Sequence, residues 1–174
     1  MIIHAFLVAA ACLLPVIGAV PRSVPVRDFP DSTTSGQIEI SAPPHEVYQR
    51  LTDYTRWSPM FSDITSATLE SGGRDDATLR FTSKTFRHAL RVRFANSPGQ
   101  SIQYTVLEGQ PPNVQIDQKW LLTPLAEGSR TLVEERVHME VRGLFSIYFT
   151  PAKVKDMREQ KVQTDLQDLA ANFR

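Results

Sequence analysis

Apolar and polar residues alternate along most of the chain between Ile64 and Val141, which is the period of a β-strand with one buried face. Turn-forming sequences such as Ser71-Gly72-Gly73 and Ser97-Pro98-Gly99 separate the alternating runs. One polar and one apolar face per strand predicts an antiparallel sheet that is covered on one side only. The five clearest runs are residues 77–82, 86–94, 102–106, 114–122 and 133–141.

Segments with helical patterns flank these strands, and the predicted helices cover the apolar face of the sheet. Residues 37–41 alternate as a short first strand, and the Pro43-Pro44 pair then begins a helix, because proline fits a first turn where an N–H has no partner. Residues 57–61 predict a second short helix. Near the C-terminus, apolar residues recur mostly three or four positions apart, which predicts an amphipathic helix of about five to six turns. Its apolar positions are Val154, Met157, Val162, Leu166, Leu169 and Phe173.

The order of these elements predicts an α+β fold. Successive hairpins make the sheet a meander, and a long helix can close against a meander only if the sheet is strongly curved. We therefore expect a curved antiparallel sheet of about seven strands that grips the C-terminal helix, with two short helices between its first and second strands.

The N-terminal segment differs from the rest of the chain. Residues 2–20 are almost wholly apolar, which predicts a signal peptide over residues 1–20 and export of the mature protein to the periplasm or outside the cell. A bilayer needs about 20 apolar residues, so an anchor over residues 2–20 is the alternative. The Pro-, Ser- and Thr-rich residues 21–36 predict a flexible linker, and residues 37–174 the folded domain.

The amino-acid composition excludes several kinds of binding site and catalytic group. The chain of 174 residues suits one domain, and its 19 basic and 19 acidic residues give zero formal net charge, so no global field attracts nucleic acid. The only cysteine, Cys12, lies in the apolar N-terminal run, which excludes an internal disulfide or a thiol nucleophile in the domain. The four histidines are scattered without metal-ligand spacing, and there is no glycine-rich phosphate loop. We expect no metal and no cofactor.

The start of the predicted domain carries a family pattern. An alternating strand over residues 38–40 is followed by Ser41-Ala42-Pro43-Pro44-His45-Glu46-Val47-Tyr48, then by Leu51-Thr52-Asp53-Tyr54, Trp57 and Phe61. This order resembles the opening of the START-like superfamily, also called SRPBCC or polyketide cyclase/dehydrase-like. The resemblance implies a helix-grip fold over residues 37–174, with a hydrophobic cavity between sheet and C-terminal helix for lipids, sterols, quinones or aromatic polyketides. It implies no shared catalytic set.

A few polar residues fall on the predicted inward faces of the strands. A hairpin turning at Ala126-Glu127 places Gln118 opposite Glu135, and a turn at Pro98-Gly99 places His88 near Glu108. A buried carboxylate without a partner costs several kcal/mol or becomes neutral, so Glu135 needs a reason to point inward. Three interpretations stay open: a structural hydrogen bond with Gln118, orientation of a ligand's hydroxyl or carbonyl, or acid–base catalysis by His88 and Glu135.

The residues expected to line the cavity combine these polar positions with apolar neighbours. The apolar stretch 143–149 before the last helix contributes either core packing or a gate to the cavity. The predicted ligand-binding residues are His88, Leu90, Val92, Tyr104, Gln118, Trp120, Glu135, Val137, Phe145, Phe149 and Met157.

Basic residues gather on the predicted outward face of two neighbouring strands. They predict a solvated sheet face or, alternatively, a patch that contacts anionic lipid headgroups. Nucleic acid is disfavoured, because no aromatic residue interleaves with them on that face. The basic residues are Arg80, Lys84, Arg87, Arg91 and Arg93.

Three functions are compatible with the sequence. The first is a non-enzymatic binder or carrier of a hydrophobic small molecule. The second is a cyclase/dehydratase-type enzyme that uses His88, Glu135 or Tyr104 as acid–base groups. The third is a membrane-tethered accessory protein that depends on its N-terminal anchor and its basic face.

Overall fold

The computed structural model describes residues 24–29, 31–85, 89–111, 113–143 and 147–173. The predicted signal peptide or anchor lies outside these ranges, so both interpretations of residues 1–20 stay predictions. In the part of the chain that the structure describes, no helix is both long enough and apolar enough to span a bilayer.

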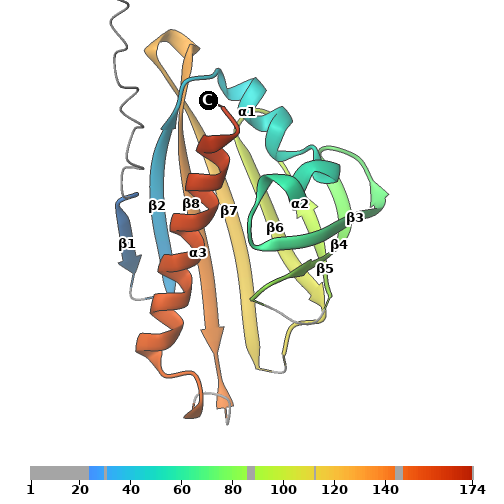
Figure 1. The fold of residues 1–174 in the computed structure, drawn as a ribbon, viewed down its shortest axis with the longest axis vertical. Helices are drawn as coiled ribbons and strands as arrows, with labels where there is room; N and C mark the ends of the chain where they lie inside the picture. Colours follow the sequence, from blue (N-terminus) through green and yellow to red (C-terminus); the bar gives the residue numbers. More distant parts are fainter. Residues whose placement is uncertain (1–23, 30, 86–88, 112, 144–146, 174) are drawn as a thin grey trace, which may run out of the picture.

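The described residues form one antiparallel sheet of eight strands in the order β1-β2-β8-β7-β6-β5-β4-β3 (Figure 1). Apart from the pairing of β2 with β8, every neighbouring pair is also consecutive in the sequence, which confirms the predicted meander. The strands are β1 (Val26–Phe29), β2 (Thr33–Ile40), β3 (Ile64–Gly72), β4 (Asp76–Ser83), β5 (Leu90–Ala95), β6 (Ser101–Glu108), β7 (Val114–Leu125) and β8 (Arg130–Val141).

The linker predicted over residues 21–36 was wrong from Val26 onward. Strand β1 pairs with the first half of β2, with Val26 opposite Gly36 and Phe29 opposite Thr33. Prolines at positions 25 and 30 flank β1 in the sequence and hid the strand from a composition argument. An edge strand tolerates such neighbours, because only one of its sides forms ladder hydrogen bonds.

The helices form where the sequence predicts them. Helix α1 (Pro44–Leu51) begins with proline in its first turn and buries Val47 and Leu51. The 3-10 turn η1 (Tyr54–Arg56) leads into the short helix α2 (Trp57–Met60). Helix α3 (Pro151–Ala171) begins after Thr150, whose side chain accepts a hydrogen bond from the Lys153 backbone N–H at 3.3 Å. This contact is a standard N-cap.

The described helices lie on the concave face of the curved sheet. Helix α3 packs over β1, β2 and β8, while α1 and α2 cover the other half (Figure 1). Trp57 fills the space beneath α2: its ring lies 5.2 Å from that of Phe94 and 5.8 Å from that of Trp120, and its indole N–H donates to the Leu51 carbonyl at 2.8 Å. Because this half of the concave face is filled by aromatic side chains, open space is left nearer to α3.

Candidate ligand-binding site

A cavity of about 330 Å³ lies between the middle of α3 and strands β4 to β8. This volume is at the lower end of the range of about 300–1,000 Å³ typical of small-molecule sites. Its apolar wall is built from alternate residues of the strands and one residue of α3, since every second strand residue faces the concave side. The apolar lining residues are Phe81, Leu90, Ile116, Val137, Met139 and Met157.

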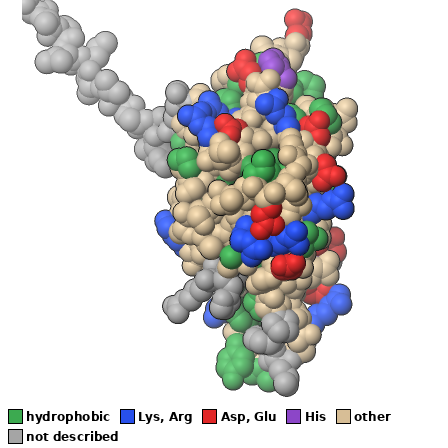
Figure 2. Space-filling model, turned by 90° about the vertical axis from the view of Figure 1, so that its right-hand side faces the viewer, with side chains coloured by type: hydrophobic (Ala, Val, Ile, Leu, Met, Phe, Trp, Pro, Cys, Tyr) green, Lys and Arg blue, Asp and Glu red, His purple; other side chains and the backbone are tan. Residues whose placement is uncertain are grey.

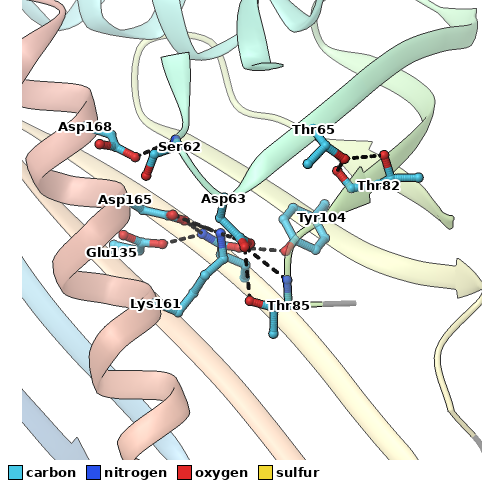
Figure 3. A network of polar contacts seen from close by, with 11 residues as sticks. Ser62, Asp63, Thr65, Thr82, Thr85, Tyr104, Glu135, Lys161, Asp165 and Asp168 are labelled. Atoms are coloured by element: carbon cyan, nitrogen blue, oxygen red, sulfur yellow. Dashed lines mark hydrogen bonds and ion pairs between the residues drawn. The ribbon is translucent and has the colours of Figure 1, made fainter. Parts of the chain in front are cut away.

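The same cavity has a polar part of its lining, here called the polar end, which contains Tyr104, Gln118, Lys161 and Asp63. Figure 3 shows Tyr104, Lys161 and Asp63 in the polar network to which Gln118 of β7 also belongs. The Tyr104 hydroxyl donates to Gln118 Oε1 at 2.6 Å. Gln118 Nε2 donates to Asp165 Oδ2 at 2.9 Å and also to Glu135 Oε1. All three hydrogen bonds are buried, so the amide links β6, β7, β8 and α3 through one side chain.

Lys161 and Asp63 continue this polar network at the cavity wall. Lys161 Nζ donates to Asp165 Oδ1 at 2.8 Å and to Oδ2 at 2.7 Å, one helical turn along α3. Its distance to Asp63 Oδ2 is 3.9 Å. Asp63 Oδ1 accepts from the Thr85 backbone N–H at 3.2 Å and from the Thr85 hydroxyl at 3.0 Å. Asp63 therefore holds the segment after β4 next to α3.

Burial sets the protonation states in this network. Desolvation, reinforced by the Asp165 charge, raises the pKa of Glu135 well above its usual range, so the site favours its protonated form. Desolvation also raises the pKa of the Tyr104 hydroxyl. Burial opposes the charge of Lys161, but the nearby Asp165 carboxylate outweighs it, and the pKa of Lys161 lies above its ordinary value. Lys161 is therefore a cation and Tyr104 a neutral phenol at neutral pH.

The structure brings five of the predicted binding residues to the cavity wall. They come from β5, β6, β7, β8 and α3, as the alternation and the helical spacing required. The five residues are Leu90, Tyr104, Gln118, Val137 and Met157.

Among the described residues, no three His, Cys, Asp or Glu side chains gather in a way that could hold a metal ion.

Other predicted positions lie elsewhere. Val92 and Trp120 point to the concave side but are buried in the core, away from the cavity lining, because the aromatic cluster around Trp57 encloses that region. Phe149 lines a separate surface groove beside Arg158. Glu135 is fully buried behind Gln118 and reaches the cavity only through it.

Two predicted residues, His88 and Phe145, lie outside the described residues. Glu108, the neighbour predicted for His88, lies opposite Arg91 in the β5–β6 ladder. The strand predicted over residues 86–94 is described from Leu90 onward as β5.

The pairing predicted between Gln118 and Glu135 is displaced by two residues. Gln118 lies opposite Val137, and Glu135 lies opposite Trp120. The hairpin turns later than expected, because residues 126–128 form a tight turn, η2 (Ala126–Gly128), with positive φ at Ala126 and Glu127. A shift of two residues keeps every side chain on its face, so the two side chains still meet.

Sequence reasoning missed Asp63, Lys161 and Asp165. The last two interrupt the buried face of α3 at positions adjacent to Val162 and Leu166, and this i,i+4 charge pair was the available signal. Asp63 has no comparable signal, since it lies in the segment between α2 and β3.

The predicted outward basic face is present, but acidic neighbours balance it. Glu70 pairs with both Arg80 and Arg91 at 2.7 Å, and Asp76 pairs with Arg93 at 3.0 Å. Figure 2, which looks onto the side where β3 to β5 lie, shows basic and acidic side chains next to each other. Lys84 is exposed at the cavity edge, and Arg87 lies outside the described residues. Contact of this face with a membrane stays a prediction.

A family model described as "Polyketide cyclase / dehydrase and lipid transport" matches residues 32–174. The chain belongs to this family. Its membership and its START-like fold support a role in hydrophobic ligand binding or in cyclase chemistry. A search among curated proteins gave no match.

Solved structures with the same fold share little sequence with this family member. A START superfamily protein from Mycobacterium smegmatis has a TM-score of 0.67 at 16% identity, covering 81% of this chain and 96% of that one. A protein from Thermus thermophilus gives the same values. The Zhui aromatase/cyclase from a Streptomyces species has a TM-score of 0.62 at 18% identity, covering 84% and 93%. These likenesses establish the helix-grip fold.

Proposed function

We propose that this protein reversibly binds a small hydrophobic molecule in the cavity beside α3 and acts as a binder or carrier. The proposal rests on a cavity whose lining combines a set of apolar side chains with the polar residues Tyr104, Gln118, Lys161 and Asp63. The apolar wall supplies affinity, at about 25 cal/mol per Å² of apolar surface removed from water. The polar end fixes the ligand's orientation, as a few polar groups do in most small-molecule sites.

The protonation states of the lining groups favour binding over catalysis. A general acid or base works best when its pKa lies near the working pH. Burial raises the pKa of Tyr104, and the pKa of Lys161 is raised because the neighbouring Asp165 carboxylate outweighs the opposing effect of burial, so both values are moved away from neutral. Glu135, whose pKa burial raises well above its usual range, is not among the residues that line the cavity.

A cyclase-type activity is the second candidate, because titratable groups converge at the polar end. Lys161 Nζ lies 2.7 Å from Asp165 and 3.9 Å from Asp63, and two of these three residues line the cavity. Such a cluster could polarise a carbonyl of a bound polyketide-like chain. Turnover of an aromatic or polyketide substrate, abolished by Lys161→Met, would favour this alternative.

Binding is tested by filling the cavity from α3. Met157→Trp adds a large side chain to the cavity wall, whereas Asp156→Trp places the same residue on the exposed side of the helix. Native mass spectrometry of the protein purified from cell extract, with decanol added as a defined probe, reads the occupancy. We expect wild type and Asp156→Trp to retain a bound molecule and Met157→Trp to lose it. Equal occupancy in all three proteins would exclude this cavity as the site.

A further inference from the structure

Tyr104 and Gln118 at the polar end of the cavity have their hydrogen-bond donors engaged within the protein. The Tyr104 oxygen gives its proton to Gln118, so only its lone pairs remain for a ligand. Gln118 uses its carbonyl oxygen on Tyr104 and its amino group on Asp165 and Glu135, so it has little to offer. The Tyr104 hydroxyl proton and the Gln118 amino group are therefore not available to donate to a ligand.

Asp63 adds a second acceptor. Its Oδ1 is held by the two hydrogen bonds from Thr85. Among the contacts of the described residues, its Oδ2 has only the Lys161 ammonium, at 3.9 Å, which is beyond hydrogen-bond distance. Figure 3 shows Asp63 lying between Lys161, Thr85 and Tyr104.

Lys161 supplies a donor next to these acceptors. An ammonium group has three N–H donors, and the two contacts with Asp165 use at most two of them. Its positive charge faces the two carboxylates of Asp63 and Asp165, so this cluster of three residues contains one more acidic than basic group. The other cation of the lining, Lys84, is exposed at the cavity edge, where solvent screens its charge. A negatively charged ligand group placed at the cluster would therefore meet repulsion from Asp63.

We propose, building on the binding function above, that the cavity selects hydrophobic alcohols and phenols and rejects hydrophobic carboxylates of the same size. A hydroxyl group has one donor and two acceptor sites, which matches the Asp63 or Tyr104 oxygen on one side and the Lys161 N–H on the other. A carboxylate has acceptors only. It would therefore face two acceptor oxygens and the Asp63 charge at short range in a partly buried site, where such repulsion is strong.

The inference is tested first on the wild-type protein with three probes of matched length. Decanol carries the hydroxyl, methyl nonyl ether is its isomer without a donor, and decanoate carries the charge at pH 7. Isothermal titration calorimetry below the probes' aggregation limits gives the three dissociation constants. We expect decanol to bind about tenfold more tightly than the ether, because the ether leaves an acceptor unpaired, and about 30-fold or more tightly than decanoate.

Variants then assign the effect to Asp63. Asp63→Asn keeps an Oδ1 acceptor for Thr85 while it removes the charge, and Asp117→Asn makes the same change on the outer face of β7. We expect Asp63→Asn to improve decanoate binding relative to decanol by about tenfold, and Asp117→Asn to leave the ratio unchanged. Tyr104→Phe should weaken decanol binding and leave the ether unaffected.

The outcomes separate this inference from the proposed function. If decanoate binds wild type as tightly as decanol, and Met157→Trp abolishes both, the hydroxyl preference is overturned while the binding function stands. If none of the three probes binds wild type, the binding function is overturned and the preference with it. An unchanged decanoate-to-decanol ratio in a folded Asp63→Asn protein would overturn the role given to that carboxylate.

Discussion

At the scale of single residues, burial of Glu135 favours its protonated form, which lets several acidic and amide groups share one buried site. Glu135 is fully buried, and no donor of the described residues faces its Oε2. The nearby Asp165 carboxylate, which Lys161 pairs with at 2.7 Å, adds to the effect of burial. Folding therefore favours proton uptake by Glu135.

This proton uptake predicts a pH-dependent stability that Glu135→Gln removes. The pKa of Glu135 is higher in the folded than in the unfolded chain, so its contribution is complete below the unfolded value of about 4.3 and is lost as pH rises toward the folded value. Within that window the free energy of unfolding of wild type should fall by up to about 1.4 kcal/mol per pH unit relative to Glu135→Gln. Urea unfolding at several pH values between 5 and 8 measures the difference.

The amide of the variant replaces the acid with a neutral group of the same shape, so its own curve serves as the reference. Parallel wild-type and Glu135→Gln curves over this range would mean that Glu135 is ionised in the folded protein. Asp117→Asn, on the outer face, should run parallel to wild type and controls for the loss of an acidic group.

The site residues on the strands could be predicted from the sequence, whereas those on helix α3 could not. Gln118 and Glu135 interrupt alternating apolar runs, so their inward direction follows from the period of two. Lys161 and Asp165 lie on a helix rich in charged residues, where a charge next to a buried position ordinarily faces solvent. Only the three-dimensional placement of Gln118 beneath α3 shows that this pair is turned inward.

At the scale of elements, helix α3 packs tightly against the sheet at Gly36 of β2. A Cβ atom at this position would lie 2.6 Å from Val162 Cγ1 and 3.2 Å from Leu166 Cδ1. The missing side chain lets α3 lie directly on the strand, and this contact fixes the side of the cavity formed by the helix. The residue that the sequence suggested as the end of a linker is therefore a packing position.

Gly36→Ala should destabilise the protein, because the new methyl group overlaps Val162 and both elements would have to move. Overpacking of this kind costs about 1–3 kcal/mol of unfolding free energy. Gly73→Ala is the matched control, since nothing lies within 4 Å of its added Cβ. Chemical denaturation of both variants measures the difference. If Gly36→Ala is as stable as Gly73→Ala, the helix is not seated on β2 as described.

The elements themselves were largely predictable, and the exceptions have physical causes. Alternation predicted the later strands, and the proline-led first turn predicted α1. Strand β1 was missed because its flanking prolines resemble a linker, although an edge strand accepts them. The β7–β8 register was displaced because the turn places Ala126 and Glu127 at positive φ, which no residue type there announces.

At the scale of the whole molecule, a buried arginine joins the first described strand to the last helix. Arg158 of α3 is 4% exposed, and its Nη2 donates to Asp28 Oδ1 of β1 at 2.7 Å. Its Nε donates to Thr34 Oγ1 at 3.0 Å and its Nη1 to the Met139 carbonyl at 3.2 Å. One side chain therefore links β1, β2, β8 and α3. Hydrogen bonds from Arg158 and Thr34 outweigh desolvation and lower the pKa of Asp28.

Arg158→Met should lower the free energy of unfolding by more than the loss of one charge would suggest. The methionine keeps much of the apolar stem, but Asp28, Thr34 and the Met139 carbonyl lose their donor in a mostly buried place. Removing one partner of such a network costs about 2–4 kcal/mol, reduced here because Asp28 is partly exposed. Lys155→Met, on the exposed side of the same helix, should change the unfolding free energy by less than about 0.5 kcal/mol.

Amide hydrogen exchange shows which elements lose stability in Arg158→Met. If Arg158 ties β1 to α3, the amides of β1 and of the first turns of α3 should lose protection in Arg158→Met before those of β6 and β7 do. The cavity is lined from the middle of α3, so a looser helix start should also weaken decanol binding without touching the polar end. Full protection of β1 in a destabilised Arg158→Met protein would show that strand pairing with β2, and not the arginine, holds the N-terminal edge in place.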